Sequence, residues 1–361
     1  MKRASSLIGH LCRSVCLLLL SAPLWGQQTA PGLMDISIQV FTHAARQEGL
    51  PPAPGPSGAA MMAESAVQAA EARYMPMLLR YRLEATGRFG AVRVLPLLDN
   101  GAELMISGQI LVSNEEQLSL SIEARDSSGR LWIGQRYDAE ARSVESLNAD
   151  PLLEDDFQAL YANIVRDLLA VLDQLPATEL EEIRNLALLH YGAALVPHHF
   201  TDFVRQSDNG RTEVLRLPAH EDPLLQRIEA IREREYLFID VVDEEYRRFY
   251  ADIKPVYDMW REYRREEVLS AADKTARAQS STSDFARGSY YALQESYNNY
   301  RWAKLQAIYL DELREGFANE TAPTDLELSD SLYRLTGTLE QQYREWRGIL
   351  AELYELEVTG Q

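Results

Sequence analysis

The clearest pattern in the chain is a strict alternation of apolar and polar residues between positions 103 and 137. Two short polar stretches, "SNEEQ" and "DSSG", divide it into three runs of strand length. In the middle run the apolar set is Leu118, Leu120, Ile122 and Ala124, and the polar set is Ser119, Ser121, Glu123 and Arg125. Because successive side chains of a strand point to opposite faces, the pattern predicts a three-stranded meander with one buried and one solvated face.

Two further strands and one helix are predicted before the meander. "MDISIQVFTH" alternates, with Ile36, Ile38 and Val40 on the inner face and Phe41 on the outer face. "AVRVLPLL" reads as a second strand. Between the two, a proline- and glycine-rich loop over 48–60 leads into a helical pattern over 60–86, which Pro76 should kink or divide. This order, a strand, a helix, a second strand and then the three-stranded meander, predicts a small N-terminal α/β sandwich domain over residues 34–145.

Residues 150–320 carry the spacing of amphipathic helices and predict a mainly α-helical region. The predicted helix starts are Asp150 with Pro151, Thr178 with Glu181 in capping-box spacing, and Asp222 with Pro223. The last of these opens a long pattern that runs to about residue 279, with a kink expected at Pro255. A further apolar stripe over 290–317 follows a polar break, so the two stripes predict a long antiparallel helical hairpin.

The hydrophobic pattern changes again in the tail, residues 324–361. "LELSDSLYRLTG" predicts a short β-hairpin, and Thr338 with Gln341 has capping-box spacing before a last amphipathic helix. A hairpin and one helix cannot form a core alone, so this unit must pack on the rest of the chain or on a partner. The fold class predicted for the whole chain is therefore α+β.

The first 26 residues have the features of a cleaved secretory signal peptide. A basic leader precedes an apolar run of about eleven residues, which is shorter than the roughly 20 needed to span a bilayer. Cleavage near Gly26 would remove both cysteines, Cys12 and Cys16. A lipoprotein cysteine comes just after the apolar run, whereas Cys16 lies at its beginning, so lipidation is not expected. An uncleaved anchor is the alternative. We expect a periplasmic protein with no integral membrane segment after cleavage and no disulfides.

The charge of the chain limits its partners. It has 36 basic and 55 acidic residues, a formal net charge of −19. Such a surface repels phosphate backbones, so nucleic acid is not an expected partner.

No residue set in the sequence predicts catalysis or a bound group. His190, His198 and His199 lie close together around Pro197, but a metal site would need further ligands and a second shell from elsewhere. The acidic stretch around Asp243 lacks a loop glycine and lies on a helix, which favours a solvated, salt-bridged face over a calcium site. We therefore expect no catalytic residue, no cofactor and no metal.

The N-terminal third of the chain resembles a known kind of domain. Residues from about 34 to 142, with "ELMISGQIL" before two polar-faced strands and a turn like "DSSGR", are similar to the small α/β domains of Gram-negative envelope assembly proteins. Examples are the N-terminal domain of the Tol-system propeller protein and the core of the curli-secretion lipoprotein. The whole chain also resembles exported proteobacterial proteins. The resemblance implies docking to envelope proteins, but no individual docking residue carries over.

Together these patterns predict a non-enzymatic, periplasmic cell-envelope protein that acts as an interaction or assembly scaffold. The alternative is a periplasmic hydrolase or ligand-binding protein with a cleft between the α/β and helical parts. Three aromatic residues are candidates for a partner surface, since Trp and Tyr anchor interfaces well: Trp260, Tyr263 and Trp346. For Trp260 a place in the core is the competing interpretation.

Overall fold

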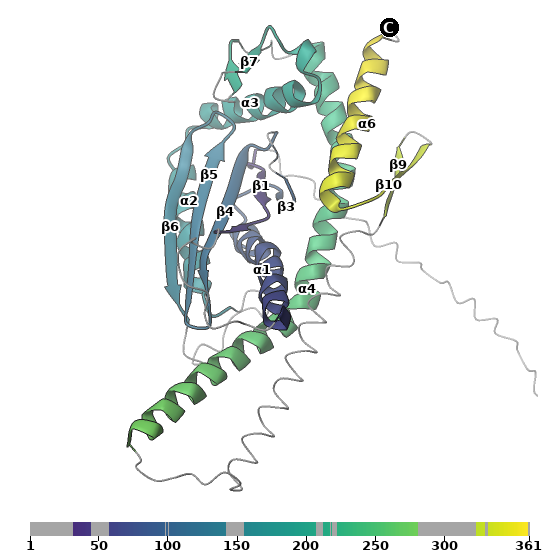
Figure 1. The fold of residues 1–361 in the computed structure, drawn as a ribbon. Coiled ribbons are helices and arrows are strands. Elements are labelled where there is room, and N and C mark those ends of the chain that lie inside the picture. Colours follow the sequence, from purple (N-terminus) through teal and green to yellow (C-terminus); the bar gives the residue numbers. More distant parts are fainter. Residues whose placement is uncertain are drawn as a thin grey trace, which may run out of the picture.

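The protein has a mixed α/β fold, seen here in a computed structural model (Figure 1). The structure describes residues 32–44, 58–97, 99, 101–141, 155–206, 212–216, 218, 222–280, 323–328 and 331–359. The predicted signal peptide, most of the proline-rich loop and the second arm of the predicted helical hairpin lie outside these residues. Within them, no helix is both long enough and apolar enough to cross a membrane.

A mixed β-sheet forms the centre of the fold. Its strands are β1 (Ile36–Gln39), β2 (Thr42–His43), β3 (Val92–Leu95), β4 (Leu104–Ser113), β5 (Gln117–Asp126) and β6 (Leu131–Glu140). They lie in the order β3-β1-β4-β5-β6, with β2 pairing with β4. The pairs of β1 with β3 and with β4 are parallel, whereas β4, β5 and β6 form an antiparallel meander.

The meander has the inner face that alternation predicts. Leu118, Leu120, Ile122 and Ala124 are all at most 1% exposed. Leu120 pairs with Tyr137 and Ala124 with Ile133 on β6, and both partners are also buried. The inner face of β5 is therefore confirmed by burial, whereas Ser119, expected on the solvated face, is fully buried as well.

Phe41 was expected on the outer face of the first strand, and this is wrong. The chain leaves the sheet line after β1, and the Phe41 amide donates to the Ala72 carbonyl of α1 at 2.8 Å. Phe41 is 2% exposed, and its ring packs directly against Gly108 of β4. A β-carbon at position 108 would lie only 2.6 Å from this ring. A two-residue break therefore turns this side chain onto β4, which simple alternation cannot anticipate.

Helix α1 (Gly58–Glu84) crosses from β1 to β3 and continues through Pro76 without division. Helix α2 (Gln158–Leu172) follows the meander and contacts β6. It begins at Gln158, well after the predicted cap at Asp150, which itself lies outside the described residues. Residues 155–157 are not helical, so no continuous helix runs from the predicted start into α2.

Helix α3 (Ala177–Leu195) begins directly after Pro176, and no side chain caps its first turn. The capping box expected at Thr178 and Glu181 is not formed, because Thr178 already lies inside the helix. A 3₁₀ turn, η1 (Pro197–His199), follows α3, and then come two short paired strands, β7 (Val204–Gln206) and β8 (Thr212–Val214).

Helix α4 (Pro223–Ser280) is 58 residues long, or about 87 Å at 1.5 Å per residue. Its start is confirmed, since the Leu224 amide donates to Asp222 Oδ1 at 3.0 Å. Pro255 lies inside α4, and a proline there removes one backbone hydrogen bond and favours a bend. The helix changes direction along its length in Figure 1.

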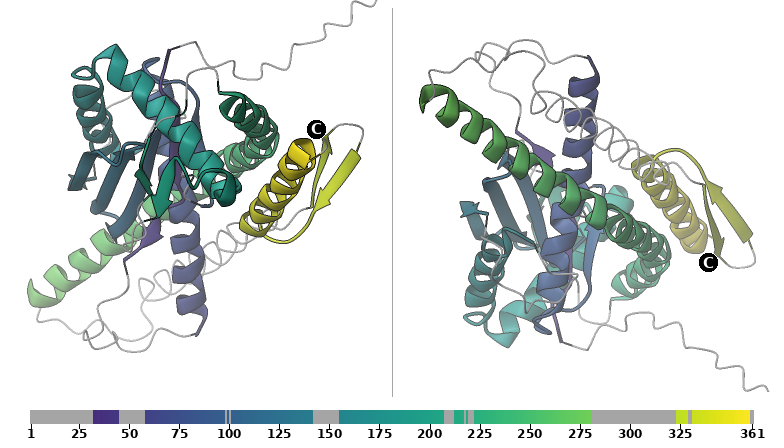
Figure 2. Two further views of the ribbon diagram at one scale, coloured as in Figure 1. Left: turned by 90° about the horizontal axis from the view of Figure 1, so that it is seen from above. Right: turned by 90° about the horizontal axis from the view of Figure 1, so that it is seen from below.

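The predicted C-terminal strand pair and helix are confirmed. Strands β9 (Thr324–Leu328) and β10 (Ser331–Leu335) are antiparallel, and α6 (Leu339–Thr359) follows them. The capping box is formed in both directions: the Thr338 amide donates to Gln341 Oε1 at 3.0 Å, and the Gln341 amide donates to Thr338 Oγ1 at 3.3 Å. Figure 2 shows this unit on the side of α4 away from the sheet.

One continuous core joins these elements. Buried apolar residues form a single cluster from Met34 in the first strand region to Tyr354 in α6. The sheet, the helical region and the C-terminal unit therefore share packing surfaces. Helix α4 connects them, since it contacts α1, α3, α6 and β3.

Candidate functional site

The two edges of the central sheet differ, and this difference defines the candidate site. Strand β3 forms one edge and β6 the other. A free edge presents a row of unpaired backbone groups that can pair with another chain, so proteins often cover it.

The β3 edge is covered by α4. Asp243 of α4 accepts a hydrogen bond from the backbone amide of Val94 on β3, with 3.4 Å between Oδ1 and the nitrogen. Asp243 is 5% exposed. A helix side chain thus takes the place that a neighbouring strand would occupy.

Asp243 also binds Arg80 of α1, whose side chain is fully buried. Glu84 accepts a hydrogen bond from Arg80 as well, with 3.0 Å between Nε and Oε1. Burial lowers the pKa of Arg80, but the attraction of Asp243 and Glu84 outweighs it and the net shift is upward. Arg80 therefore stays charged, and its charge depends on Asp243 for compensation.

A second contact joins β3 to α4 on the outer face of the sheet. The Arg93 guanidinium lies 4.5 Å from the centre of the Tyr236 ring, and its Nε is 3.3 Å from Asp240 Oδ1. The acidic stretch predicted as a solvated helix face thus supplies Asp240 and Asp243 to the sheet instead. Glu244 does pair along the helix as predicted, with 3.8 Å between its Oε1 and Arg248 Nε.

Farther along α4, a buried chain of polar contacts fixes the helix to α1 and to the β4–β5 turn. Tyr257 donates to Glu71 of α1 at 2.7 Å, and Arg261 donates to the Tyr257 hydroxyl at 2.7 Å. Arg261 also reaches the Asn114 carbonyl and lies 4.5 Å from the centre of the Phe157 ring. The covered edge is therefore held by contacts spread over several turns of α4.

The β6 edge has no such cover among the residues that the structure describes. Strand β6 pairs with β5 on one side, while α2 packs on its inner face. In Figure 1 β6 is the outermost strand of the central sheet, at its left edge. The Ala141 amide points towards the neighbouring strand, because it donates to the Glu116 carbonyl of the β4–β5 turn at 2.7 Å. Since bonding alternates along an antiparallel ladder, the backbone groups that point outward are those of Gly134, Arg136, Asp138 and Glu140.

The side chains of these outward-bonding residues are exposed and mostly charged. Arg136 and Asp138 pair with each other on the solvent face, with 2.7 Å between Nη2 and Oδ1. The hydrogen bond from Arg136 lowers the pKa of Asp138, with Ser119 adding to the effect. Charges on an edge limit indiscriminate pairing without removing the backbone donors and acceptors.

Two buried carboxyl groups lie near the covered edge. Burial and the repulsion of Asp35 raise the pKa of Glu103 to about 7. Burial also raises the pKa of Glu235, although Arg347 counteracts it. The hollow lined by Asp35 and Arg93 has a volume of about 10 Å³, the size of a single water. Neither Glu103 nor Glu235 lines this hollow.

The three aromatic candidates for a partner surface have different environments. Trp346 is fully buried and packs edge-on against Tyr333, with ring centres 5.8 Å apart. A partner cannot reach it in this structure, because α6 turns it towards the core. Trp260 is half-buried and stacks on Tyr257 at 6.0 Å. The side chain of Tyr263 lies outside the described part.

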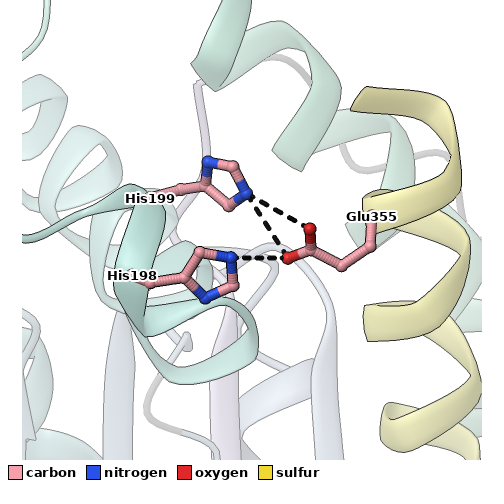
Figure 3. A group of neighbouring side chains, drawn as sticks. All are labelled: His198, His199 and Glu355. Atoms are coloured by element: carbon pink, nitrogen blue, oxygen red, sulfur yellow. Dashed lines mark hydrogen bonds and ion pairs between the residues drawn. The ribbon is translucent and has the colours of Figure 1, made fainter. Parts of the chain in front are cut away.

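Two of the three neighbouring histidines meet a carboxylate from the other end of the chain. His198 and His199 of η1 converge on Glu355 of α6, and together they form a group that could hold a metal ion (Figure 3). His190 is not in this group, and burial lowers its pKa. No sequence pattern points to Glu355, because 156 positions separate it from His199.

Comparison with known proteins finds no matching family model, no similar curated protein and no similar solved structure. The class that fold and site define is a mixed α/β protein in which a helix covers one edge of the sheet and no described residue covers the other.

Proposed function

We propose that this chain is a non-enzymatic, exported interaction protein that binds an extended segment of a partner at the outer edge of β6. The observation that carries the proposal is the contrast between the two edges: α4 covers β3, whereas β6 has ten residues and no described neighbour on its outer side. Residues 34–145 then act as the docking unit, a small α/β sandwich, and the helices support it.

Strand addition is a recognised way to bind a peptide. The main-chain hydrogen bonds supply affinity, and alternate side chains of the added strand supply specificity. Here the inner face of an added strand would lie beside Tyr137 and Ile133, so it favours apolar residues there. The net charge of −19 favours basic residues on its solvent face.

The cell-envelope setting is supported by the sequence. The leader over residues 1–26 has the features of an export signal, and the surface charge keeps such a protein soluble. The partner class we propose is therefore an envelope protein with an exposed, alternating segment. Amino-terminal sequencing of the purified protein tests export: a mature start near Gln27 is expected, and an intact Met1 contradicts it.

Site-specific photocrosslinking tests the docking edge. A photoreactive residue in place of Arg136 should capture a partner in native envelopes, and the crosslinked segment can be mapped by mass spectrometry. A synthetic peptide of that segment is then titrated into the purified chain. We expect binding that Asp138→Pro abolishes, because proline removes one outward amide and leaves the amides of Tyr137 and Ala139 paired with β5.

The matched control is Asp138→Ala, which removes the same charge and keeps the amide. Equal binding of the peptide to both variants contradicts strand addition. A dimer of the chain that Asp138→Pro dissociates assigns the edge to self-association instead, and overturns the proposal of a separate partner.

A further inference from the structure

A compact group of metal-ligating side chains lies at the junction of η1 and α6, far from either sheet edge in sequence. His198 Nε2 is 2.8 Å and His199 Nε2 is 3.3 Å from Glu355 Oε1. One ligand atom from each of the three residues lies within 4.8 Å of the others. In Figure 3 both imidazole rings point from the turn towards the carboxylate on the helix.

The backbone on both sides of these ligands is fixed by buried neighbours. Val196 before the pair is 2% exposed and Phe200 after it is fully buried. The Phe200 ring occupies the space beside Gly192, where a β-carbon would meet it at 2.3 Å. This close approach turns the chain back sharply after α3, and it needs glycine at position 192.

The carboxylate is fixed in the same way. Tyr354, next to Glu355, is fully buried in α6 and meets the His199 ring edge-on, with centres 5.3 Å apart. The backbones of the three residues therefore lie on two packed elements rather than on a free loop, and the His198 side chain itself is 67% exposed.

The distances suit a small ion with nitrogen and oxygen ligands. Two ligand atoms bound to Zn²⁺ at about 2.0–2.1 Å in a tetrahedron lie roughly 3.3 Å apart. The separations of 2.8 and 3.3 Å need only small shifts to reach this value. Mg²⁺ and Ca²⁺ prefer oxygen ligands throughout, whereas a pair of imidazoles selects zinc and its neighbours in the first transition row.

We propose that His198, His199 and Glu355 bind a Zn²⁺-class ion through three protein ligands. The fourth position would open into the adjacent groove, a hollow of about 530 Å³ whose lining includes Leu195, Pro197 and Leu356. Water or an external carboxylate can fill that position. The ion would also tie η1 to the last helix, so that its binding would stabilise the packing of the C-terminal unit.

The competing explanation needs no metal. A histidine that donates Nε2–H to a carboxylate makes the same contacts, and here one carboxylate serves two histidines. A conservative variant separates the two explanations, because glutamine can still accept these hydrogen bonds but is a poor metal ligand. The test is therefore built on Glu355→Gln.

The full chain, purified without a histidine tag and treated with chelator, is titrated with Zn²⁺ by calorimetry and with Co²⁺ by visible absorption. Glu355→Gln and His199→Asn are compared with Glu352→Gln, a control one turn earlier on α6. Glu352 lines the same groove and is exposed, but it is not in the ligand group.

We expect one equivalent to bind to the wild-type chain and to the Glu352→Gln control, with a four-coordinate Co²⁺ spectrum. Both ligand variants should weaken binding by at least about 100-fold, beyond the roughly 10–100-fold that loss of an outer-shell partner costs. Zn²⁺ should raise the unfolding midpoint of the wild-type chain and the control only.

No binding to the wild-type chain, or equal binding to the wild type and both ligand variants, overturns the proposal. If neither variant folds, the Co²⁺ spectrum of the wild-type chain decides: four-coordinate absorption supports the site and a six-coordinate spectrum overturns it. None of these outcomes depends on the partner proposed for β6.

Discussion

The two edges of the central sheet use the same pair of residue types in opposite ways. At the covered edge, Arg80 and Asp243 form an ion pair whose side chains are 0% and 8% exposed. At the open edge, Arg136 and Asp138 form one whose side chains are 53% and 47% exposed. The first joins three elements, α1, β3 and α4, whereas the second lies within a single strand.

Burial decides what each pair does. An exposed ion pair contributes about 0–1 kcal/mol, because water solvates either partner well when the other is removed. Removing one partner of a buried pair costs roughly 3–5 kcal/mol, because it leaves a charge without compensation. The covered edge is thus fixed to its helix, whereas the ion pair on β6 can be removed at little cost in stability.

Loss of Asp243 should have the largest effect on this comparison. Asp243→Ala leaves the fully buried Arg80 with Glu84 alone and removes the acceptor of the Val94 amide. We expect the free energy of unfolding in urea to fall by about 3–5 kcal/mol. Asp138→Ala at the open edge is the matched control and should leave the unfolding midpoint unchanged. Similar losses in the two variants would mean that α4 does not seal the β3 edge.

The pH dependence of stability should be the next largest effect. The pKa of Glu103 is raised to about 7, so the folded state binds a proton more tightly than the unfolded chain does. The contribution of protonated Glu103 to the free energy of unfolding is therefore fully present below about pH 4.5 and is lost as pH rises towards and through 7. This contribution is at most about 3 kcal/mol. Glu103→Gln should be less sensitive to pH than the wild type.

Urea unfolding of both proteins at pH 5 and pH 8 measures this difference. The wild type should lose stability relative to Glu103→Gln at the higher pH, since only the wild type must bury a charge there. A constant difference between the two proteins would show that Glu103 ionises normally in the folded state.

A smaller effect is expected at Trp260, on the helix that covers the β3 edge. Because Trp260 is only half-buried, Trp260→Ala should cost about 2 kcal/mol, against roughly 3–5 kcal/mol for the fully buried Trp346→Ala. Partner recovery from crosslinked envelopes, compared at equal folded concentration, tests the docking role of Trp260. Unchanged recovery would restrict docking to the β6 edge.

The smallest effect on stability should come from Asp138→Pro at the open edge. Only an outward amide is lost there, so the free energy of unfolding should change by less than about 1 kcal/mol. Thermal and urea unfolding measure it, alongside the loss of peptide binding. A large destabilisation would mean that the Asp138 amide is already paired, and that the β6 edge is not free.

The sequence by itself determined the local elements of this protein. The strict alternation around Leu120 specified which face of the meander is buried, because a one-residue shift would expose the whole apolar set. Thr338 and Gln341 specified the start of α6, since both partners of a capping box lie within four residues. These features depend on neighbours in the chain, which a sequence displays directly.

Only the tertiary structure decided which surfaces these elements cover. The sequence around Asp243 predicts a surface residue on a charged helix, and only the packing of α4 against β3 buries it. Its partner Arg80 is 163 positions away in the sequence. Glu355 joins the two histidines of η1 only because α6 returns to the end of α3. Contacts at such separations follow from how helices and sheet pack, and the residue types alone do not indicate which of many acidic side chains will be buried beside a given cation.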